Sequence, residues 1–318
     1  MKLISIIIPC YNEEDVLPLF IEKINEVTNS INNYQFEYIF INDGSKDKTL
    51  ELLKIYREKD NRIKFIDFSR NFGKEMGMLA GMDFSNGDAI VIIDADLQHP
   101  PEMIIEMIEY WEKGYDDVYT VRLNREDTFL KKIASKLYYK ILQSLTQDNV
   151  YPNTGDFRLL DRKCVEVLVS MRETERYTKG MYGWIGFNKK ELTYVENKRE
   201  KGQTKWQFNH LLKLAIDGIT SYSTVPLRLS SLLGVLISTL SFLFLLLEII
   251  KIIINGPKVA GYGTIISGIL FMGGIQLISL GIIGEYLSRV FIETKKRPPY
   301  IIKEISEDIV RCDNNGEN

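Results

Sequence analysis

The stretch AIVIIDADLQHPP, residues 89–101, begins as an apolar run and ends in acidic and polar residues. Such a run, rich in β-branched residues, favours a buried strand whose carboxyl end opens onto solvent, and ligands of open α/β sheets bind at that end. Asp94 and Asp96 stand there one residue apart. On an extended backbone they would point the same way and could hold Mg²⁺ or Mn²⁺ through oxygen ligands. The alternative is a strand that ends in a solvated acidic turn.

Polar clusters also follow two earlier apolar runs, at residues 3–8 and 38–41. The first run leads to Tyr11, Asn12 and Glu13, and the second leads to Asp43. Segments with helical periodicity separate the runs, and this alternation implies a parallel sheet with right-handed crossovers. Because the carboxyl ends of parallel strands meet at one edge, we expect the three clusters to line a single crevice.

The composition narrows the class of protein. The formal net charge of −3 over 318 residues gives no reason to expect a nucleic-acid partner. Three distant cysteines, Cys10, Cys164 and Cys312, match no zinc or disulfide pattern, so we expect a reducing compartment. His99 and His210 each lack a second histidine at ligand spacing, so no zinc site is expected.

Two uncharged, mostly apolar runs occupy residues 229–247 and 259–284. Each could cross a hydrocarbon core about 30 Å thick, which takes roughly 20 helical residues. We therefore predict a two-helix transmembrane hairpin, with a buried soluble hairpin as the alternative. The connection at 255–258 carries a single lysine, whereas Arg228 precedes the first run and several basic residues follow the second. This asymmetry predicts a membrane protein with the N-terminal domain and the C-terminus in the cytosol.

The predicted organisation has four parts: a cytosolic α/β domain at 1–205, an amphipathic juxtamembrane helix at 206–228, two spans at 229–288 and a cytosolic tail at 289–318. The polar tail after Lys303 is expected to be disordered. Residues 129–145 and 206–222 combine an apolar stripe with lysines on the other side, which favours helices at the membrane interface. Packing against the protein's own core is the alternative for both.

Three motifs occur in order: PCYNEE at 9–14, NDGSKD at 42–47 and DADLQHP at 94–100. Together they resemble the signature of family 2 inverting glycosyltransferases, which have the GT-A fold, a Rossmann-like and mostly parallel sheet. The LQHP continuation and two C-terminal spans are more specifically similar to polyisoprenyl-phosphate glycosyltransferases of the dolichyl-phosphate mannose synthase and bacterial GtrB type. The resemblance covers about residues 3–290.

The resemblance implies roles for particular residues. It assigns the nucleotide to Pro9, Tyr11, Asn12, Glu13, Asp43 and Asp94. It assigns a Mg²⁺ or Mn²⁺ ion to Asp94 and Asp96, and catalysis to Asp96 and to Asp156 of the GDFR stretch at 155–158. It assigns the acceptor phosphate to Gln98, Arg122, Lys132, Ser135, Arg199 and Lys205. Whether Asp156 takes a proton or positions substrates stays open, because a lipid monophosphate with a second pKa of about 6 needs no base.

The implied activity is an inverting hexosyl or N-acetylhexosaminyl transfer from a nucleoside-diphosphate sugar, with UDP favoured, to a polyprenyl phosphate such as undecaprenyl phosphate at the cytosolic membrane face. The resemblance also implies a homotetramer, a flippase and a downstream lumenal or extracellular transferase as partners. One alternative is a family 2 transferase that acts on another lipid or on a polysaccharide. The other is a catalytically silent scaffold that binds a sugar nucleotide.

Overall fold

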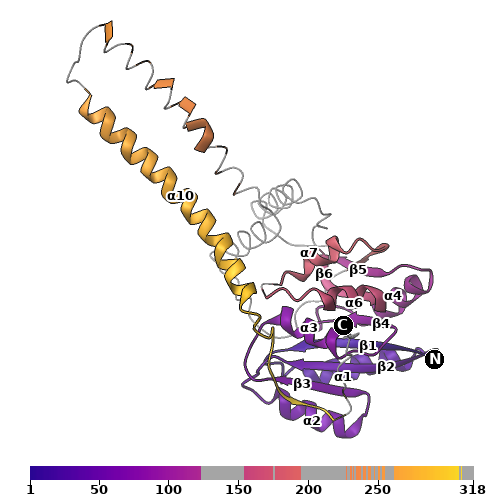
Figure 1. Cartoon of the computed structure of the whole chain (residues 1–318). Coiled ribbons are helices and arrows are strands. Elements are labelled where there is room, and N and C mark those ends of the chain that lie inside the picture. The colour runs from indigo at the N-terminus through magenta and orange to yellow at the C-terminus, as the bar shows by residue number, and fades with distance from the viewer. Residues whose placement is uncertain are drawn as a thin grey trace, which may run out of the picture. The chain divides into compact units, whose positions relative to one another are not determined.

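The computed structural model describes residues 1–122, 154–174, 176–194, 261–307 and 309, and also 227, 230, 232, 234–237, 239–240, 243–244, 247, 250 and 253–254. The chain divides into two compact units (Figure 1). The sheet unit comprises Met1–Gln143, Gln147–Gln207 and Arg297–Asn318. The helical unit comprises Ser144–Thr146 and Phe208–Lys296.

An eight-stranded mixed sheet forms the centre of the sheet unit, with the strand order β7-β5-β6-β4-β1-β2-β3-β8. The strands are β1 (Lys2–Cys10), β2 (Tyr34–Asn42), β3 (Ile63–Phe68), β4 (Ala89–Ile92), β5 (Asp117–Arg122), β6 (Thr154–Asp161), β7 (Lys189–Tyr194) and β8 (Ile302–Ile305). Strands β1 to β4 run parallel to their neighbours among themselves, whereas β6 and β8 are antiparallel to the strands they flank. The predicted α/β sheet is therefore confirmed.

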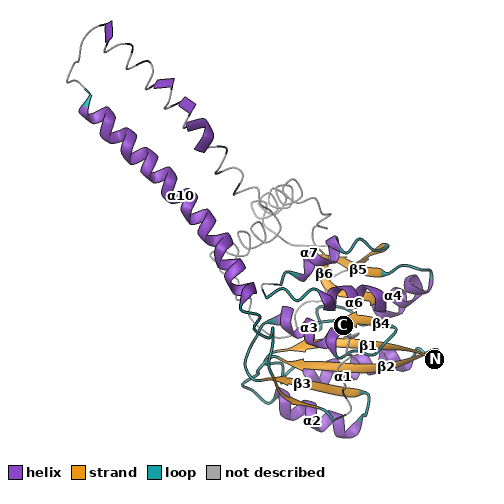
Figure 2. Cartoon of the chain, viewed as in Figure 1, coloured by secondary structure: helices purple, strands orange, loops and turns teal. Residues whose placement is uncertain are grey.

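Helices cover both faces of the sheet, which explains why its central strands are almost continuously apolar (Figure 2). The helices are α1 (Leu17–Asn29), α2 (Thr49–Lys59), α3 (Lys74–Asp83), α4 (Met103–Glu112), α6 (Arg162–Ser170) and α7 (Thr178–Trp184). Alternate side chains of β1 enter opposite cores: Ile6 packs with α1, α2 and α4, and Ile7 packs with α3, α6 and α7. Helix α3 approaches closely, because a Cβ atom at Gly81 would overlap the side chain of Ile7.

The C-terminal segment returns to the sheet unit, and its first residues after Lys303 are ordered, contrary to expectation; residues 308 and 310–318 of the predicted disordered tail lie outside the described part of the chain. Strand β8 pairs antiparallel with β3, placing Ile305 opposite Ile66. Beyond the strand, the Ser306 hydroxyl accepts a hydrogen bond from the Phe65 backbone N–H at 3.2 Å. The ring of Tyr300 stacks on Phe68, with centroids 5.2 Å apart. The sequence did not reveal this strand because a four-residue strand carries too little periodicity.

In the helical unit, α10 (Tyr262–Thr294) contains one segment, Phe271–Thr294, that is long and apolar enough to cross a membrane, with a mean hydropathy of 1.4. It is the single such helix among the described residues. The first predicted span, 229–247, falls partly outside them, although the described positions in that run are helical. The two-helix hairpin therefore stays a prediction, as does its orientation.

Candidate active site

Backbone-to-side-chain hydrogen bonds join the loops that follow β1 and β2. The Asn12 backbone N–H donates to the Ser45 hydroxyl at 2.9 Å, and Asn12 Oδ1 accepts from the Lys46 N–H at 2.8 Å. The Glu13 N–H donates to the Thr49 hydroxyl at 2.9 Å. Asn12 adopts φ 57°, a left-handed conformation that asparagine tolerates better than most residues. The loops are thus held side by side at the carboxyl edge of the sheet, as the sequence predicts.

Asp43 fixes the segment that leads into α3. Its two carboxylate oxygens accept the backbone N–H groups of Phe72 at 2.6 Å and Gly73 at 2.9 Å. Burial raises the pKa of the Asp43 carboxyl, although these two N–H groups and Arg70 oppose the shift. The neighbouring Gly44 has φ +66°, and a Cβ there would lie 2.5 Å from the Arg70 carbonyl carbon. Only glycine at position 44 lets the loop after β2 approach the backbone of Arg70 this closely.

The acidic pair lies beyond the end of β4, and the expectation of extended backbone through both aspartates is wrong for Asp96, which lies in a turn. Strand β4 ends at Ile92, and Ala95 and Asp96 form a turn followed by Leu97 at φ 60°. Ala95 and Leu97 are both buried and pack in the core that contains α1 and α4, whereas Asp94 and Asp96 are only partly buried. Asp96 accepts the Gln98 N–H at 3.1 Å within this turn.

The register of β6 brings Asp156 towards Asp94. Strand β6 runs antiparallel to β4 with Arg158 opposite Ile92, so Asp156 extends past the end of β4 at the level of Asp94. Two like charges facing each other across a strand pair are destabilising. Lys74 compensates them: its Nζ lies 2.7 Å from Asp94 Oδ1 and 2.8 Å from Asp156 Oδ2.

The charged forms of Asp94, Lys74 and Asp156 stabilise one another. Burial alone would raise the pKa of Asp94, but Lys74 and His99 outweigh it and hold the pKa well below its usual value. The pKa of Asp156 is likewise lowered, because Lys74 and Lys179 outweigh its burial. Burial disfavours the ammonium of Lys74, yet the two carboxylates raise its pKa. All three groups are therefore charged at neutral pH.

A buried histidine connects Asp94 to β5 and β7. His99 Nε2 lies 3.5 Å from Asp94 Oδ2, and His99 Nδ1 lies 2.7 Å from the Tyr194 hydroxyl. Arg122 Nε donates to the same hydroxyl at 3.2 Å. A line of polar contacts thus runs from Arg122, at the end of β5, to the acidic turn.

Strand β6 is anchored by a buried arginine two residues after Asp156. Arg158 Nη1 pairs with Asp117 at 3.0 Å, and its guanidinium lies 3.4 Å from the centroid of the Tyr182 ring. On α3, Glu75 Oε2 accepts the Thr178 N–H at 3.1 Å and also the Thr178 hydroxyl. Burial and the negative charge of Asp156 raise the pKa of Glu75. These contacts fix the backbone on both sides of the Lys74 bridge.

The structure brings most of the predicted residues to one edge of the sheet. Those described there are Pro9, Tyr11, Asn12, Glu13, Asp43, Asp94, Asp96, Gln98, Arg122 and Asp156. Tyr11 is 44% exposed at this edge, as a ligand-binding aromatic residue would be. The predicted residues Lys132, Ser135, Arg199 and Lys205 lie outside the described part of the chain, as do both predicted interfacial helices.

Sequence reasoning missed Lys74, Tyr194 and Glu75, and it considered His99 only as a zinc ligand. One signal was present for Lys74, which follows Phe72 and Gly73 at the predicted start of a helix after a strand. A helix in that position begins at the carboxyl edge of the sheet, where the other site residues were already expected.

The oxygen donors at this edge suit a hard divalent cation. Asp94, Asp96 and Asp156 supply carboxylates, and Asp156 Oδ1 is buried with no hydrogen-bond partner among the described residues. No group of three His, Cys, Asp or Glu side chains in the described ranges is arranged to hold a metal. Mg²⁺ sites that also bind nucleotides use one or two carboxylates with substrate phosphates, so Asp94 and Asp96 offer enough protein ligands.

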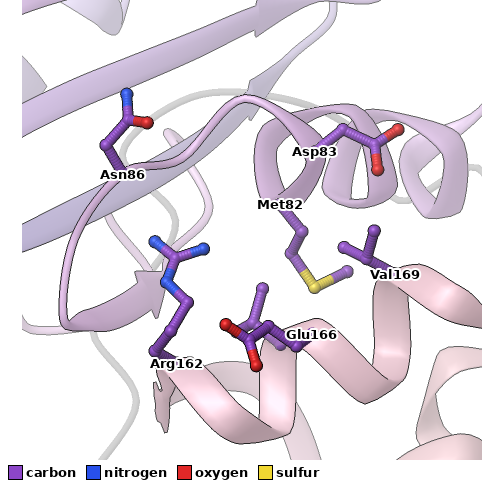
Figure 3. A pocket seen from close by; sticks show the side chains of 7 residues that line it. Met82, Asp83, Asn86, Arg162, Glu166 and Val169 are labelled. Atoms are coloured by element: carbon purple, nitrogen blue, oxygen red, sulfur yellow. The ribbon is translucent and has the colours of Figure 1, made fainter. Parts of the chain in front are cut away.

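A separate cavity of about 140 Å³ lies between the end of α3 and α6 (Figure 3). Met82, Asp83, Asn86, Arg162, Val165, Glu166 and Val169 line it. Asn86 precedes β4, so this cavity is at the opposite end of that strand from Asp94. It is not part of the candidate active site.

Comparisons with known proteins identify the family of the chain. The family model "Glycosyl transferase family 2" matches residues 5–169. An uncharacterized glycosyltransferase of Synechocystis is 44% identical, with 95% of each chain covered. A prophage bactoprenol glucosyl transferase homolog of Escherichia coli is 40% identical over 96% of this chain and 99% of that protein. A bactoprenol glucosyl transferase of Shigella phage SfX is 39% identical over 94% of this chain and 98% of its own.

Proposed function

Because the chain belongs to glycosyl transferase family 2, we propose that it moves a single sugar from a nucleoside diphosphate, namely UDP, to the phosphate of a polyprenyl carrier at a membrane. The observation that carries this proposal is the full-length similarity to bactoprenol glucosyl transferases. The apolar segment Phe271–Thr294 supports a lipid acceptor, because it could keep the chain at a membrane.

The donor would bind at the carboxyl ends of β1, β2 and β4. Exposed Tyr11 can cover the nucleotide base, and the loops joined by Asn12 and Glu13 provide amide and carboxylate groups for the base and ribose. Both oxygens of Asp43 already accept backbone N–H groups. Each carboxylate oxygen has a second lone pair, so Asp43 could still accept a hydrogen bond from the nucleotide.

Asp94 and Asp96 would hold the divalent cation. When bound, the cation supplies Lewis-acid chemistry that neutralises charge on the departing diphosphate. Asp94 is oriented by Lys74 and His99, and Asp96 by its contact with the Gln98 N–H. These contacts hold the two carboxylates at the carboxyl end of β4 before the donor arrives.

Asp156 would orient the acceptor, with Arg122 near the acceptor phosphate. A lipid monophosphate is largely dianionic at neutral pH, since its second pKa is about 6, so its oxygen can attack without a protein base. Attack from the side opposite the diphosphate would invert the anomeric carbon. Asp156 is anchored through β6 by the Arg158 to Asp117 ion pair, which keeps its carboxylate in a fixed position.

The test uses full-length protein in detergent with undecaprenyl phosphate and a panel of radiolabelled UDP- and GDP-sugars. We expect one label to enter the lipid phase with release of the nucleoside diphosphate. Asp156→Asn and Asp96→Ala should lose most of this transfer, whereas Glu58→Gln, an exposed carboxylate-to-amide change on α2, should keep it. No label in the lipid phase with any of the sugars, or equal release by wild type and Asp96→Ala, would contradict the proposal.

A further inference from the structure

Lys74 lies between two carboxylates, that of Asp94 in the segment after β4 and that of Asp156 in β6. It is the first residue of α3, and Asp43 fixes the backbone just before it through Phe72 and Gly73. Its Nζ contacts both oxygens of Asp94, at 2.7 and 2.8 Å, and also Asp156 Oδ2 at 2.8 Å. The ammonium thus bridges the acidic turn and β6.

The bridge engages both carboxylate oxygens of Asp94, the atoms that a donor-bound cation would also need. An ammonium and a divalent cation that share the same carboxylate repel each other strongly at short range, particularly where solvent is partly excluded. The Asp156 side chain is only 11% exposed, whereas that of Lys74 is 39% exposed. The lysine therefore has room to swing towards solvent, while Asp156 stays in place.

We propose that Lys74 is an internal counter-ion that holds Asp94 and Asp156 together in the free protein and must release Asp94 when the cation and diphosphate bind. This inference rests on the proposed function, because it takes the incoming group to be a metal-bound nucleoside diphosphate. Lys74 is a positioning residue in this scheme.

Lys74 makes cation binding conditional on the nucleotide. Without nucleotide, the cation must displace Lys74 from Asp94 and gains only carboxylate ligands from the protein. With nucleotide, the displaced ammonium remains next to a diphosphate, whose negative charge compensates it. Removal of the lysine charge should therefore strengthen cation binding in the absence of nucleotide and reduce the further gain that UDP brings.

The experiment measures free Mn²⁺ by electron paramagnetic resonance during titration of the full-length protein in detergent, with and without UDP. We expect Lys74→Met to bind Mn²⁺ at least tenfold more tightly than wild type when UDP is absent. Lys74→Arg keeps the charge and should behave like wild type. UDP should tighten Mn²⁺ binding less in Lys74→Met than in wild type.

Equal or weaker Mn²⁺ binding by Lys74→Met, including no detectable binding by either protein, would overturn the inference. Thiol labelling of the buried Cys10 and Cys164 checks that the variant is folded, and Lys74→Gln replaces it if it is not. The titration uses neither sugar donor nor lipid acceptor. A tenfold gain alongside failed transfer would therefore refute the proposed function and leave the counter-ion role standing, whereas the reverse pattern would refute the role of Lys74 alone.

Discussion

The Nδ1 atom of His99 lies 2.7 Å from the hydroxyl oxygen of Tyr194. With that hydroxyl as the donor, the proton of His99 is on Nε2 and faces Asp94 Oδ2 at 3.5 Å. Arg122, which donates to the same hydroxyl, then stands at the other end of a directed line of hydrogen bonds. The acidic turn and the residue expected to meet the acceptor phosphate are thereby coupled.

Tyr194→Phe should lower the rate of sugar transfer about fivefold, because one buried hydrogen bond contributes roughly 1 kcal/mol. The ring and its packing against Phe157 would remain, so the variant should fold normally. Tyr119→Phe is a matched control on β5, since its hydroxyl bonds to Glu191 at 3.1 Å away from this line. Initial rates with saturating acceptor would measure the effect, and equal losses in both variants would contradict it.

Gly44→Ala should destabilise the sheet unit by more than Gly114→Ala does. Both glycines have positive φ, but a Cβ at Gly114 meets nothing within 4 Å, whereas at Gly44 it meets the backbone of Arg70 and Asn71 at 2.5 to 2.9 Å. The overlap should add about 1–3 kcal/mol to the cost of the backbone conformation. The thermal unfolding midpoint would measure this cost, with unfolding detected by thiol labelling of Cys10 and Cys164 in a Cys312→Ser background.

Burial of the Cys10 thiol, together with nearby carboxylates, raises its pKa well above the usual value, so labelling of the folded protein should be slow. If Gly44→Ala and Gly114→Ala lowered the thermal unfolding midpoint equally, the close approach of Gly44 to the backbone of Arg70 would have no effect on stability.

Glu75→Gln should make the protein more stable at pH 8 than wild type. Burial and the charge of Asp156 raise the pKa of Glu75 in the folded state, although Thr178 and Lys179 oppose the shift. A raised pKa means that the contribution of Glu75 to stability is complete below its unfolded pKa of about 4.3 and is lost as the pH rises through the folded value. Glutamine is neutral throughout and can still accept from Thr178.

The thermal unfolding midpoint of Glu75→Gln relative to wild type, followed by circular dichroism, should therefore rise from pH 4 to pH 8. Over this range Glu75 of unfolded wild type ionises, with a pKa of about 4.3, whereas the folded state resists the ionisation. Glu58→Gln, at an exposed position on α2, is the control. If the difference between the two unfolding midpoints stayed constant with pH, ionisation of Glu75 would not destabilise the folded protein.

Substitutions at Tyr300 should reveal how strongly the C-terminal segment holds the sheet unit. The Tyr300 hydroxyl donates to buried Asp83, which also accepts two hydrogen bonds from Arg172 at 2.7 Å. Tyr300→Phe should cost about 1 kcal/mol through that hydrogen bond, and Tyr300→Ala about 3–5 kcal/mol, because the ring stacked on Phe68 is lost too. Thermal unfolding would measure both effects, and equal unfolding midpoints for Tyr300→Phe and Tyr300→Ala would contradict a stabilising role for the stacked ring.

The sequence predicts the elements whose apolar periodicity is strong and misses the contacts that depend on tertiary register. Strands β1 and β4 are apparent because they are buried on both faces. The Lys74 bridge depends on β6 running antiparallel beside β4, which no local pattern reveals. The turn at Ala95 and Asp96 was missed because polar and apolar residues alternate from Asp94 to Leu97, which is also the pattern of a strand.

The position of β8 has a consequence for how the chain is synthesised. This strand covers the free edge of β3, yet it emerges from the ribosome only after the whole of α10. During translation, the edge of β3 therefore stays unpaired while α10 is made. Exposed strand edges can pair with other chains, so the nascent protein is most vulnerable to aggregation in this interval, which ends once β8 is made and pairs with β3.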